Sequence, residues 1–349
     1  MPQYIEPRKP DGTLSHRTSV DVSIIIVNWN SIDYLRECVV SICERTQDAS
    51  FEVIVVDNAS PAGDAERLEQ QLPRKVKLIK SPTNLGFAGA NNLGFRHSSG
   101  KYLLFLNPDT KLVSPAIDTM VQGIQALPDA GVLGCRLLYS DLSLQTSCIQ
   151  TFPTILNQLL DSDWLCQRWP DSKLWGIGPL FSNSSEPAKV EVISGACMLV
   201  RRDVFEQVGL FSEDYFMYAE DLDLCYKVAR SGHSNYYLGT ATVIHYGGKS
   251  SNPGWATQMK WKSIPRFCEK NYGQFYAAMF RIAMASAAIG RLIAISVTGL
   301  FGSTFGSRQS RRVAFVKWKL ILKTLVTLSN GSSPSSNSSE TGLDCVVQP

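Results

Sequence analysis

The sequence lacks the features of a secreted, disulfide-stabilised protein. Its nine cysteines are dispersed and include no Cys-x-x-Cys pair, and no apolar segment of the signal-peptide type opens the chain. An odd, dispersed set of cysteines without such a segment indicates a reducing compartment. We therefore expect a cytoplasmic protein whose cysteines are mostly small buried side chains.

Two nucleotide-binding motifs are also missing. The first strongly apolar run is followed by NWNSIDY, which has no glycine. The G-x-G-x-x-G loop of NAD and FAD enzymes would follow such a strand. No Walker A loop occurs either. These absences argue against dinucleotide binding and against a P-loop NTPase.

Charge is scarce and unevenly distributed. Of the 349 residues 19% are charged and 44% are hydrophobic, which is enough for a sizeable core in one large domain or two smaller ones. Residues 260–323 carry twelve Lys or Arg and one acidic residue, whereas the rest has 22 basic and 30 acidic residues. This asymmetry indicates an anionic partner, nucleic acid or a membrane surface. Because no nucleic-acid-binding motif accompanies the charge, we expect a membrane surface and no nucleic acid.

The first third of the chain alternates between buried-strand and helical patterns. Such alternation predicts right-handed βαβ units and an α/β fold, a parallel sheet with helices on both faces. In such a sheet, ligands bind at the carboxyl ends of the strands. The expected strands are 22–29, 51–60, 76–81 and 101–110, and the expected helices are 33–45, 63–72 and a helix opening at 89–98.

Polar residues follow three of these strands. Asn and Asp are good turn formers, so one such strand end would mean little, but three at the same sheet edge favour a binding site. A carboxylate at Asp57 can accept hydrogen bonds from a ribose or a pyrimidine, and Asp109 can hold a hard divalent cation that bridges phosphates. The polar residues are Asn28 and Asn30, Asp57 and Asn58, and Asn107 and Asp109.

A segment rich in glycine and asparagine, NLGFAGANNLG, lies between the third strand and the next helix. Small residues let a backbone approach a ligand, and helix N-termini favour anions. Asn84 and Gly86 are the first candidates in it. Together with the strand ends, this segment predicts a site for a nucleotide diphosphate and a metal, Mg²⁺ or Mn²⁺.

Seven segments occur in the order expected of family 2 glycosyltransferases. They resemble, more narrowly, the bacterial rhamnosyltransferase-like branch, as do residues 139–154, and the resemblance covers residues 22–250. The segments are VSIIIVNWN, FEVIVVDNAS, NLGFAGANNLGF, LLFLNPDT, ISGACMLVRRDVFEQVGLF, FMYAEDLDLCYKVARSGH and VIHYGGKSS.

The resemblance implies a GT-A fold, a Rossmann-like nucleotide-binding sheet, and inverting transfer from a nucleotide sugar. By position, Asp57 would contact the nucleotide base, Asp109 would bind the metal, and Asp221 would be the general base. His245 would be a late metal ligand or a diphosphate contact. The chain departs from the family pattern at Asn107, which replaces the first carboxylate of the D-x-D motif. It also departs at a serine in GLFSEDYF, to which we assign no role.

Three carboxylates crowd the start of a predicted helix over 220–230, which Gly232 is expected to stop. An acidic helix N-terminus can serve stability alone, because the helix dipole favours negative charge there. The dipole keeps a carboxylate ionised, whereas burial and like charges raise its pKa, a balance that suits a base near neutral pH. An inverting transfer needs one such base. We expect Asp221 in this role, with Glu220 as the alternative or as a residue that orients Asp221 or the acceptor.

Two further regions carry expectations. Gly195 is expected to line the donor-sugar or acceptor side, although a tight sheet position would also need a small residue there. The apolar stretch 275–306 is interrupted by two arginines, and its longest charge-free run, 292–307, is short for a membrane span. We expect an amphipathic, membrane-surface element, with a helical hairpin packed on the catalytic domain as the alternative.

The predicted organisation is a flexible lead-in (1–21), a GT-A domain (22–270), a basic and apolar helical extension (271–328) and a disordered tail (329–349). The predicted function is transfer of L-rhamnose from dTDP-rhamnose to a polyprenyl-diphosphate-linked or oligosaccharide acceptor in cell-surface polysaccharide assembly, at the inner face of the plasma membrane. Alternatives are another donor, a UDP-hexose or UDP-galactofuranose, and a nucleotide-sugar-binding scaffold without turnover. A nucleotidyltransferase is disfavoured, since no basic, glycine-rich loop follows the first strand.

Overall fold

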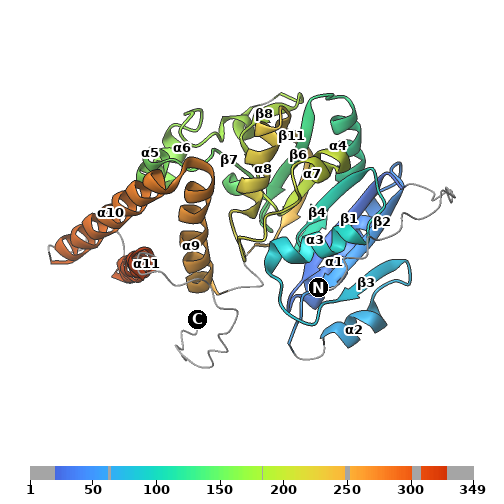
Figure 1. The fold of residues 1–349 in the computed structure, drawn as a ribbon, viewed down its shortest axis with the longest axis horizontal. Coiled ribbons are helices and arrows are strands. Elements are labelled where there is room, and N and C mark those ends of the chain that lie inside the picture. The colour runs from blue at the N-terminus through green and yellow to red at the C-terminus, as the bar shows by residue number, and fades with distance from the viewer. Residues whose placement is uncertain (1–19, 62–63, 183, 248–251, 301–307, 328–349) are drawn as a thin grey trace, which may run out of the picture.

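The computed structural model describes residues 20–61, 64–182, 184–247, 252–300 and 308–327. The predicted tail 329–349 and nearly all of the predicted lead-in 1–21 lie outside these residues. Figure 1 shows the central sheet with its helices on one side of the molecule and three long helices on the other.

A nine-stranded sheet runs through the protein in the order β3-β2-β1-β4-β10-β6-β11-β5, with β8 also paired to β11. A separate two-stranded sheet pairs β7 with β9. The strands are β1 (Val22–Asn28), β2 (Phe51–Asp57), β3 (Val76–Lys80), β4 (Tyr102–Leu106), β5 (Thr110–Leu112), β6 (Ala130–Leu138), β7 (Ile149–Gln150), β8 (Ala188–Val190), β9 (Val192–Ile193), β10 (Cys197–Arg201) and β11 (Ser234–His245).

The parallel sheet predicted from the first third of the chain is confirmed for β3, β2, β1 and β4, whereas the rest of the sheet is mixed. Strand β10 runs antiparallel to both β4 and β6, and β5 runs antiparallel to β11. The predicted strand 101–110 is also two strands, because Asn107-Pro108-Asp109 turns the chain between β4 and β5. Apolar runs predict that a strand is buried but not the direction in which it runs. The sequence therefore did not predict the antiparallel strands of this GT-A-like mixed sheet.

Helices cover both faces of the sheet, as expected. Alternate residues of β2 point to opposite faces: Ile54 and Val56 pack with Ala90 of α3, whereas Val55 lies in the main core with Leu35 of α1. The helices are α1 (Ile32–Arg45), α2 (Asp64–Gln71), α3 (Gly86–Arg96), α4 (Ala116–Gln125), α5 (Ile155–Leu160), α6 (Asp163–Arg168), α7 (Arg202–Gln207), α8 (Glu220–Arg230), α9 (Pro253–Tyr272), α10 (Gln274–Leu300) and α11 (Arg308–Thr327).

Helices α9, α10 and α11 pack against one another and form what we call the helical side. Helix α9 joins the helical side to the nine-stranded sheet and its covering helices, because Phe267 is buried in the main core and Ser263 donates a hydrogen bond to the carbonyl of Met217 at 2.9 Å. By length and composition, residues 274–298 of α10 could cross a membrane, with a mean hydropathy of 1.6. Helix α10 covers residues 275–300 of the predicted apolar stretch 275–306, and residues 301–307 lie outside the described part.

Candidate active site

The ends of β1 and β2 hold a buried pair of polar side chains. Asn28 lies opposite Asp57 in the parallel register, and its Nδ2 donates to Asp57 Oδ1 at 3.0 Å and to Ser60 Oγ at 3.2 Å. The second carboxylate oxygen of Asp57 accepts from the Ser60 backbone N–H at 3.4 Å. Asn30 follows with a left-handed φ of +54° and an exposed side chain. This edge therefore fixes the Asp57 carboxylate in place before any ligand arrives.

Asn58 organises the loop before α3. Its Nδ2 donates to Asn84 Oδ1 at 2.9 Å and to the Gly86 carbonyl at 3.2 Å, and its Oδ1 accepts from Leu85 N at 2.8 Å. Gly86 has φ +70°, and a Cβ there would lie 2.3 Å from the carbonyl oxygen of Phe216. The glycine is thus required by backbone conformation and by close approach of the chain that leads to α8. The sequence analysis counted Asn58 among the polar strand ends but did not predict this individual role.

Asn107, Asp109 and His245 meet at the next strand ends. His245 Nε2 lies 3.4 Å from Asp109 Oδ1 and 3.2 Å from Asn107 Nδ2. On the other side of the ring, Nδ1 lies 3.0 Å from Gln145 Oε1, and Gln145 Nε2 donates to the His245 carbonyl. Because the Gln145 amide oxygen can only accept, this contact places a proton on Nδ1 and directs Nε2 toward Asp109.

The Asp109–His245 pair suits a divalent cation. No group of three His, Cys, Asp or Glu side chains capable of holding a metal occurs among the described residues, so a cation here would need further ligands, such as water or phosphate oxygens. Mg²⁺ is commonly held by one or two protein carboxylates together with substrate phosphates. A histidine ligand is normally oriented by a hydrogen bond to its other nitrogen, which is what Gln145 provides. Gln145 was missed as a single residue, although the 139–154 segment that contains it was noticed.

Helix α8 runs over Glu220–Arg230 as predicted, and its first turn places Asp221 beside Gly195. Asp221 Oδ2 accepts from the Gly195 N–H at 3.0 Å and Oδ1 from the Leu222 N–H at 2.8 Å. Burial raises the pKa of Asp221 above its ordinary value, while these two hydrogen bonds and, more weakly, the charge of Lys260 lower it. The side chain stays half-buried and so remains within reach of a substrate. The local structure therefore uses Gly195 to hold the Asp221 carboxylate.

Glu220 and Asp223 differ from Asp221 in their surroundings. Glu220 is 5% exposed, its Oε2 has no hydrogen-bond partner within the described residues, and burial with the neighbouring Asp221 charge raises its pKa well above the usual value. Asp223 is fully buried and accepts hydrogen bonds from Lys270 at 3.1 Å, Asn271 at 3.1 Å and Tyr215 at 3.2 Å. The three crowded carboxyl groups thus differ: Glu220 is buried with an unpartnered oxygen, Asp221 is partly accessible, and Asp223 is a buried ion-pair partner.

The strand ends and the start of α8 are connected by hydrogen bonds. The Asn107 N–H donates to the Ala196 carbonyl at 3.0 Å, and the preceding residue, Gly195, holds Asp221. The Phe87 N–H donates to the Phe216 carbonyl at 2.9 Å, which ties the start of α3 to the approach to α8. The predicted residues therefore fall into four small groups along linked loops.

A family comparison identifies the kind of protein to which this chain belongs. The family described as "Glycosyl transferase family 2" matches residues 23–209, more than half of the chain. The chain belongs to this family of glycosyltransferases. The resemblance seen in the seven segments is confirmed.

Individual relatives are distant. The chain is 28% identical to the N-acetylglucosaminyl-diphospho-decaprenol L-rhamnosyltransferase of Mycobacterium tuberculosis over 65% of its length and 76% of that protein. It is 27% identical to rhamnosyltransferase WbbL of Escherichia coli over 69% of its length and 89% of that protein. Its match spans only 24% of a much longer uncharacterised Sinorhizobium fredii protein, y4gI.

Solved structures confirm the fold. The mannosyltransferase PcManGT of Pyrobaculum calidifontis, in complex with GDP-Man and Mn²⁺, aligns with a TM-score of 0.55 at 17% identity over 92% of this chain and 90% of that one. At this identity the likeness establishes the GT-A-type architecture only. The substrates of this chain have to be inferred from its own residues.

Proposed function

We propose that this protein is an inverting, metal-dependent glycosyltransferase that moves L-rhamnose from dTDP-rhamnose to a lipid-linked or oligosaccharide acceptor in cell-surface polysaccharide assembly. The observation that carries the mechanism is the half-buried Asp221 carboxylate, held by two backbone N–H groups. The donor and acceptor are suggested by the two relatives named as rhamnosyltransferases, one of which has a diphospho-decaprenol in its name.

In the proposed reaction, Asp221 accepts the proton of the acceptor hydroxyl as its oxygen bonds to C1 of the sugar. The bond between C1 and the phosphate oxygen breaks, and the nucleoside diphosphate leaves with that electron pair. One displacement inverts C1 and needs no covalent carboxylate. Glu220 is the poorer candidate, because its side chain is buried, whereas that of Asp221 is partly accessible.

The donor would lie along the ends of β1, β2 and β4. Asp57 would accept hydrogen bonds from the nucleoside, with Asn28, Asn30, Asn84 and Gly86 shaping that part of the edge. Asp109 and His245 would hold a Mg²⁺ or Mn²⁺ ion, whose positive charge would offset the negative charge of the leaving diphosphate. Gly195 and Asn107 would complete the sugar side, where the 194–196 loop joins the two halves of the site.

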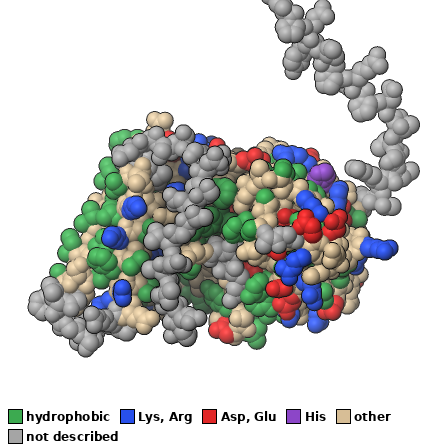
Figure 2. Space-filling model, turned by 90° about the horizontal axis from the view of Figure 1, so that it is seen from below, with side chains coloured by type: hydrophobic (Ala, Val, Ile, Leu, Met, Phe, Trp, Pro, Cys, Tyr) green, Lys and Arg blue, Asp and Glu red, His purple; other side chains and the backbone are tan. Residues whose placement is uncertain are grey.

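We also propose that the helical side rests on the cytoplasmic face of the membrane. One stripe of α10 exposes large apolar side chains at helical spacing, among them Phe275 (81% exposed), Ile282 (67%) and Ile293 (58%). Figure 2 shows the hydrophobic side chains of this side together with Lys and Arg, whereas the acidic side chains gather mainly elsewhere. An apolar stripe beside cations suits a surface of anionic lipids.

The test is a panel of nucleotide sugars assayed for hydrolysis and thermal stabilisation, with and without Mg²⁺ or Mn²⁺. We expect metal-dependent stabilisation and hydrolysis, greatest with dTDP-rhamnose. Preference for a UDP-sugar would keep the mechanism and overturn the donor. Binding without hydrolysis or transfer would favour a scaffold, and no response to any nucleotide sugar would overturn the site.

A further inference from the structure

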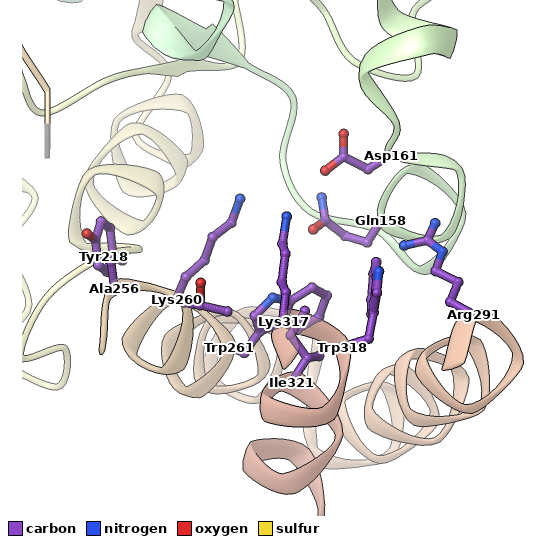
Figure 3. Close-up of a pocket in the computed structure, with 11 residues that line it drawn as sticks. Gln158, Asp161, Tyr218, Ala256, Lys260, Trp261, Arg291, Lys317, Trp318 and Ile321 are labelled. Carbon is purple, nitrogen blue, oxygen red and sulfur yellow. The ribbon is translucent and has the colours of Figure 1, made fainter. Parts of the chain in front are cut away.

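A pocket of about 270 Å³ lies between the helical side and the catalytic part, close to the lower end of the usual range for small-ligand sites. Figure 3 shows its walls: α9, α10 and α11 on one side, and the segment around Gln158 and Asp161 on the other. None of the residues assigned to the donor edge lines it. The pocket is therefore distinct from the donor edge.

Positive charge dominates this pocket. Lys260, Arg291 and Lys317 line it, against a single acidic residue, Asp161. Arg291 is already engaged, because it donates to the Leu159 carbonyl at 2.9 Å and its guanidinium lies 4.2 Å from the Trp318 ring centroid.

The two lysines differ from Arg291 in their contacts. Within the described ranges, neither Lys260 nor Lys317 forms an ion pair with a carboxylate. Figure 3 shows both side chains extending in the same direction, from α9 and α11, into the space below Asp161. Two ammonium groups directed into one cleft repel each other, so an anion bound between them would relieve that repulsion.

The pocket borders the proposed base. Lys260 is near enough to Asp221 for its charge to lower the pKa of that carboxyl. Tyr218 also lines the pocket, three residues before Asp221, and both Tyr218 and Ala219 adopt left-handed φ values of +66° and +69°. Such conformations are uncommon for residues other than glycine and tend to occur at functional sites. An anion held here would place groups attached to it near Asp221.

We propose that this pocket binds the diphosphate of a prenyl-diphosphate-linked acceptor, with Lys260 and Lys317 contacting the phosphates. The proposal rests on the transferase function above and adds to it the location of the acceptor. The sugar end of the acceptor would extend toward Asp221, and the prenyl chain would pass over the apolar wall formed by Trp261, Trp318 and Ile321. The donor diphosphate would remain at Asp109 and His245, so each diphosphate has its own cations.

Binding of farnesyl diphosphate to the full chain tests the proposal, with inorganic pyrophosphate and farnesol as comparison probes. EDTA is present so that no cation at Asp109 recruits a phosphate. We expect Lys317→Ala and Lys260→Ala each to weaken farnesyl diphosphate binding roughly tenfold, as for loss of one charge-assisted contact. Lys262→Ala is the matched control: it removes an equal charge from α9 two residues away, on a different face.

Unchanged binding by the Lys260→Ala/Lys317→Ala double variant would overturn the proposal, and so would equal weakening by Lys262→Ala. Pyrophosphate binding as tightly as farnesyl diphosphate would replace the lipid-linked acceptor with a free anion. Farnesol binding as tightly would show that the phosphates are not recognised.

Donor hydrolysis without acceptor separates this proposal from the transferase function. We expect Lys317→Ala to hydrolyse the donor as the wild type does while its KM for a prenyl-diphosphate-linked sugar rises about tenfold. A wild-type protein that hydrolyses no donor would refute the transferase function, yet the farnesyl diphosphate data would still decide what the pocket binds. A lowered kcat with unchanged KM would contradict an acceptor-binding role.

Discussion

The two sides of this molecule differ in which side chains they bury and which they expose. At the donor edge, the polar side chains of Asn28, Asp57 and Asp109 are buried, and they contact other polar side chains: Asn28 contacts Asp57, and Asp109 contacts His245. On the helical side, apolar residues of α10 are exposed, and two lysines of the pocket lack a carboxylate partner among the residues described. A preorganised edge suits a small, rigid, charged donor, whereas an exposed apolar and cationic surface suits a large amphiphilic acceptor.

Substitution of the proposed base should have the largest effect, and only on the catalytic side. Asp221→Asn keeps the shape and can still accept from Gly195 but cannot take a proton near neutral pH. We expect transfer to fall by about 10²–10⁴-fold, the usual contribution of a general base. Initial rates measure this, and thermal stabilisation by nucleotide sugar should stay as in the wild type. Full activity in the variant would exclude Asp221 as the base.

The reverse experiment removes apolar groups from the helical side. Ile282→Ser with Ile289→Ser takes two exposed side chains from α10, so folding should be little affected. If these two isoleucines are buried in lipid when the protein binds a membrane, their loss would weaken binding by about 3 kcal/mol, or roughly a hundredfold in partitioning. Co-sedimentation with anionic lipid vesicles measures this loss, and donor hydrolysis should not change.

The control for that variant is Val40→Ser, which removes a side chain of similar exposure from α1. It should bind vesicles as the wild type does. If both variants bind equally well, the exposed stripe of α10 is not a membrane surface.

A third substitution tests the link between the two sides. Asp223 of α8 accepts hydrogen bonds from Lys270 and Asn271 of α9. Asp223→Asn should lower the free energy of unfolding by about 2 kcal/mol, because the buried carboxylate that accepts hydrogen bonds from Lys270 and Asn271 is replaced by a neutral amide. Urea titration measures this. Turnover of the folded variant should stay near the wild-type value, in contrast to Asp221→Asn two residues away; a loss as large as that of Asp221→Asn would mean that Asp223 takes part in catalysis.

The sequence predicted what depends on local pattern. Buried β-branched runs predicted β1 and β2, and helical spacing with a following glycine predicted α8 from Glu220 to Arg230. The antiparallel course of β10 was missed, because an apolar run has the same pattern in either direction. Gln145 was missed as an individual residue because its contact with His245 spans 100 positions. The pocket was missed for the same reason: Lys260 and Lys317 meet only when α9 and α11 pack together.

The smallest expected effect distinguishes Glu220 from its neighbour through pH. Burial raises the pKa of Glu220 in the folded protein, so the folded state binds this proton more tightly than the unfolded state does. The resulting stability is fully present below the unfolded value, about 4.3, and is lost as the pH rises toward the folded value. Glu220→Gln cannot ionise, so it avoids that loss.

Urea unfolding of the wild type and of Glu220→Gln at pH 5 and pH 8 measures this difference. The variant should gain stability relative to the wild type on going from pH 5 to pH 8. The raised pKa of Asp221 acts in the same direction in both proteins and largely cancels from the comparison. Transfer should remain within about tenfold of the wild type, because the base is retained. A relative gain at pH 5 instead would show that Glu220 is stabilised as a carboxylate, and that either acidic residue could then serve as the base.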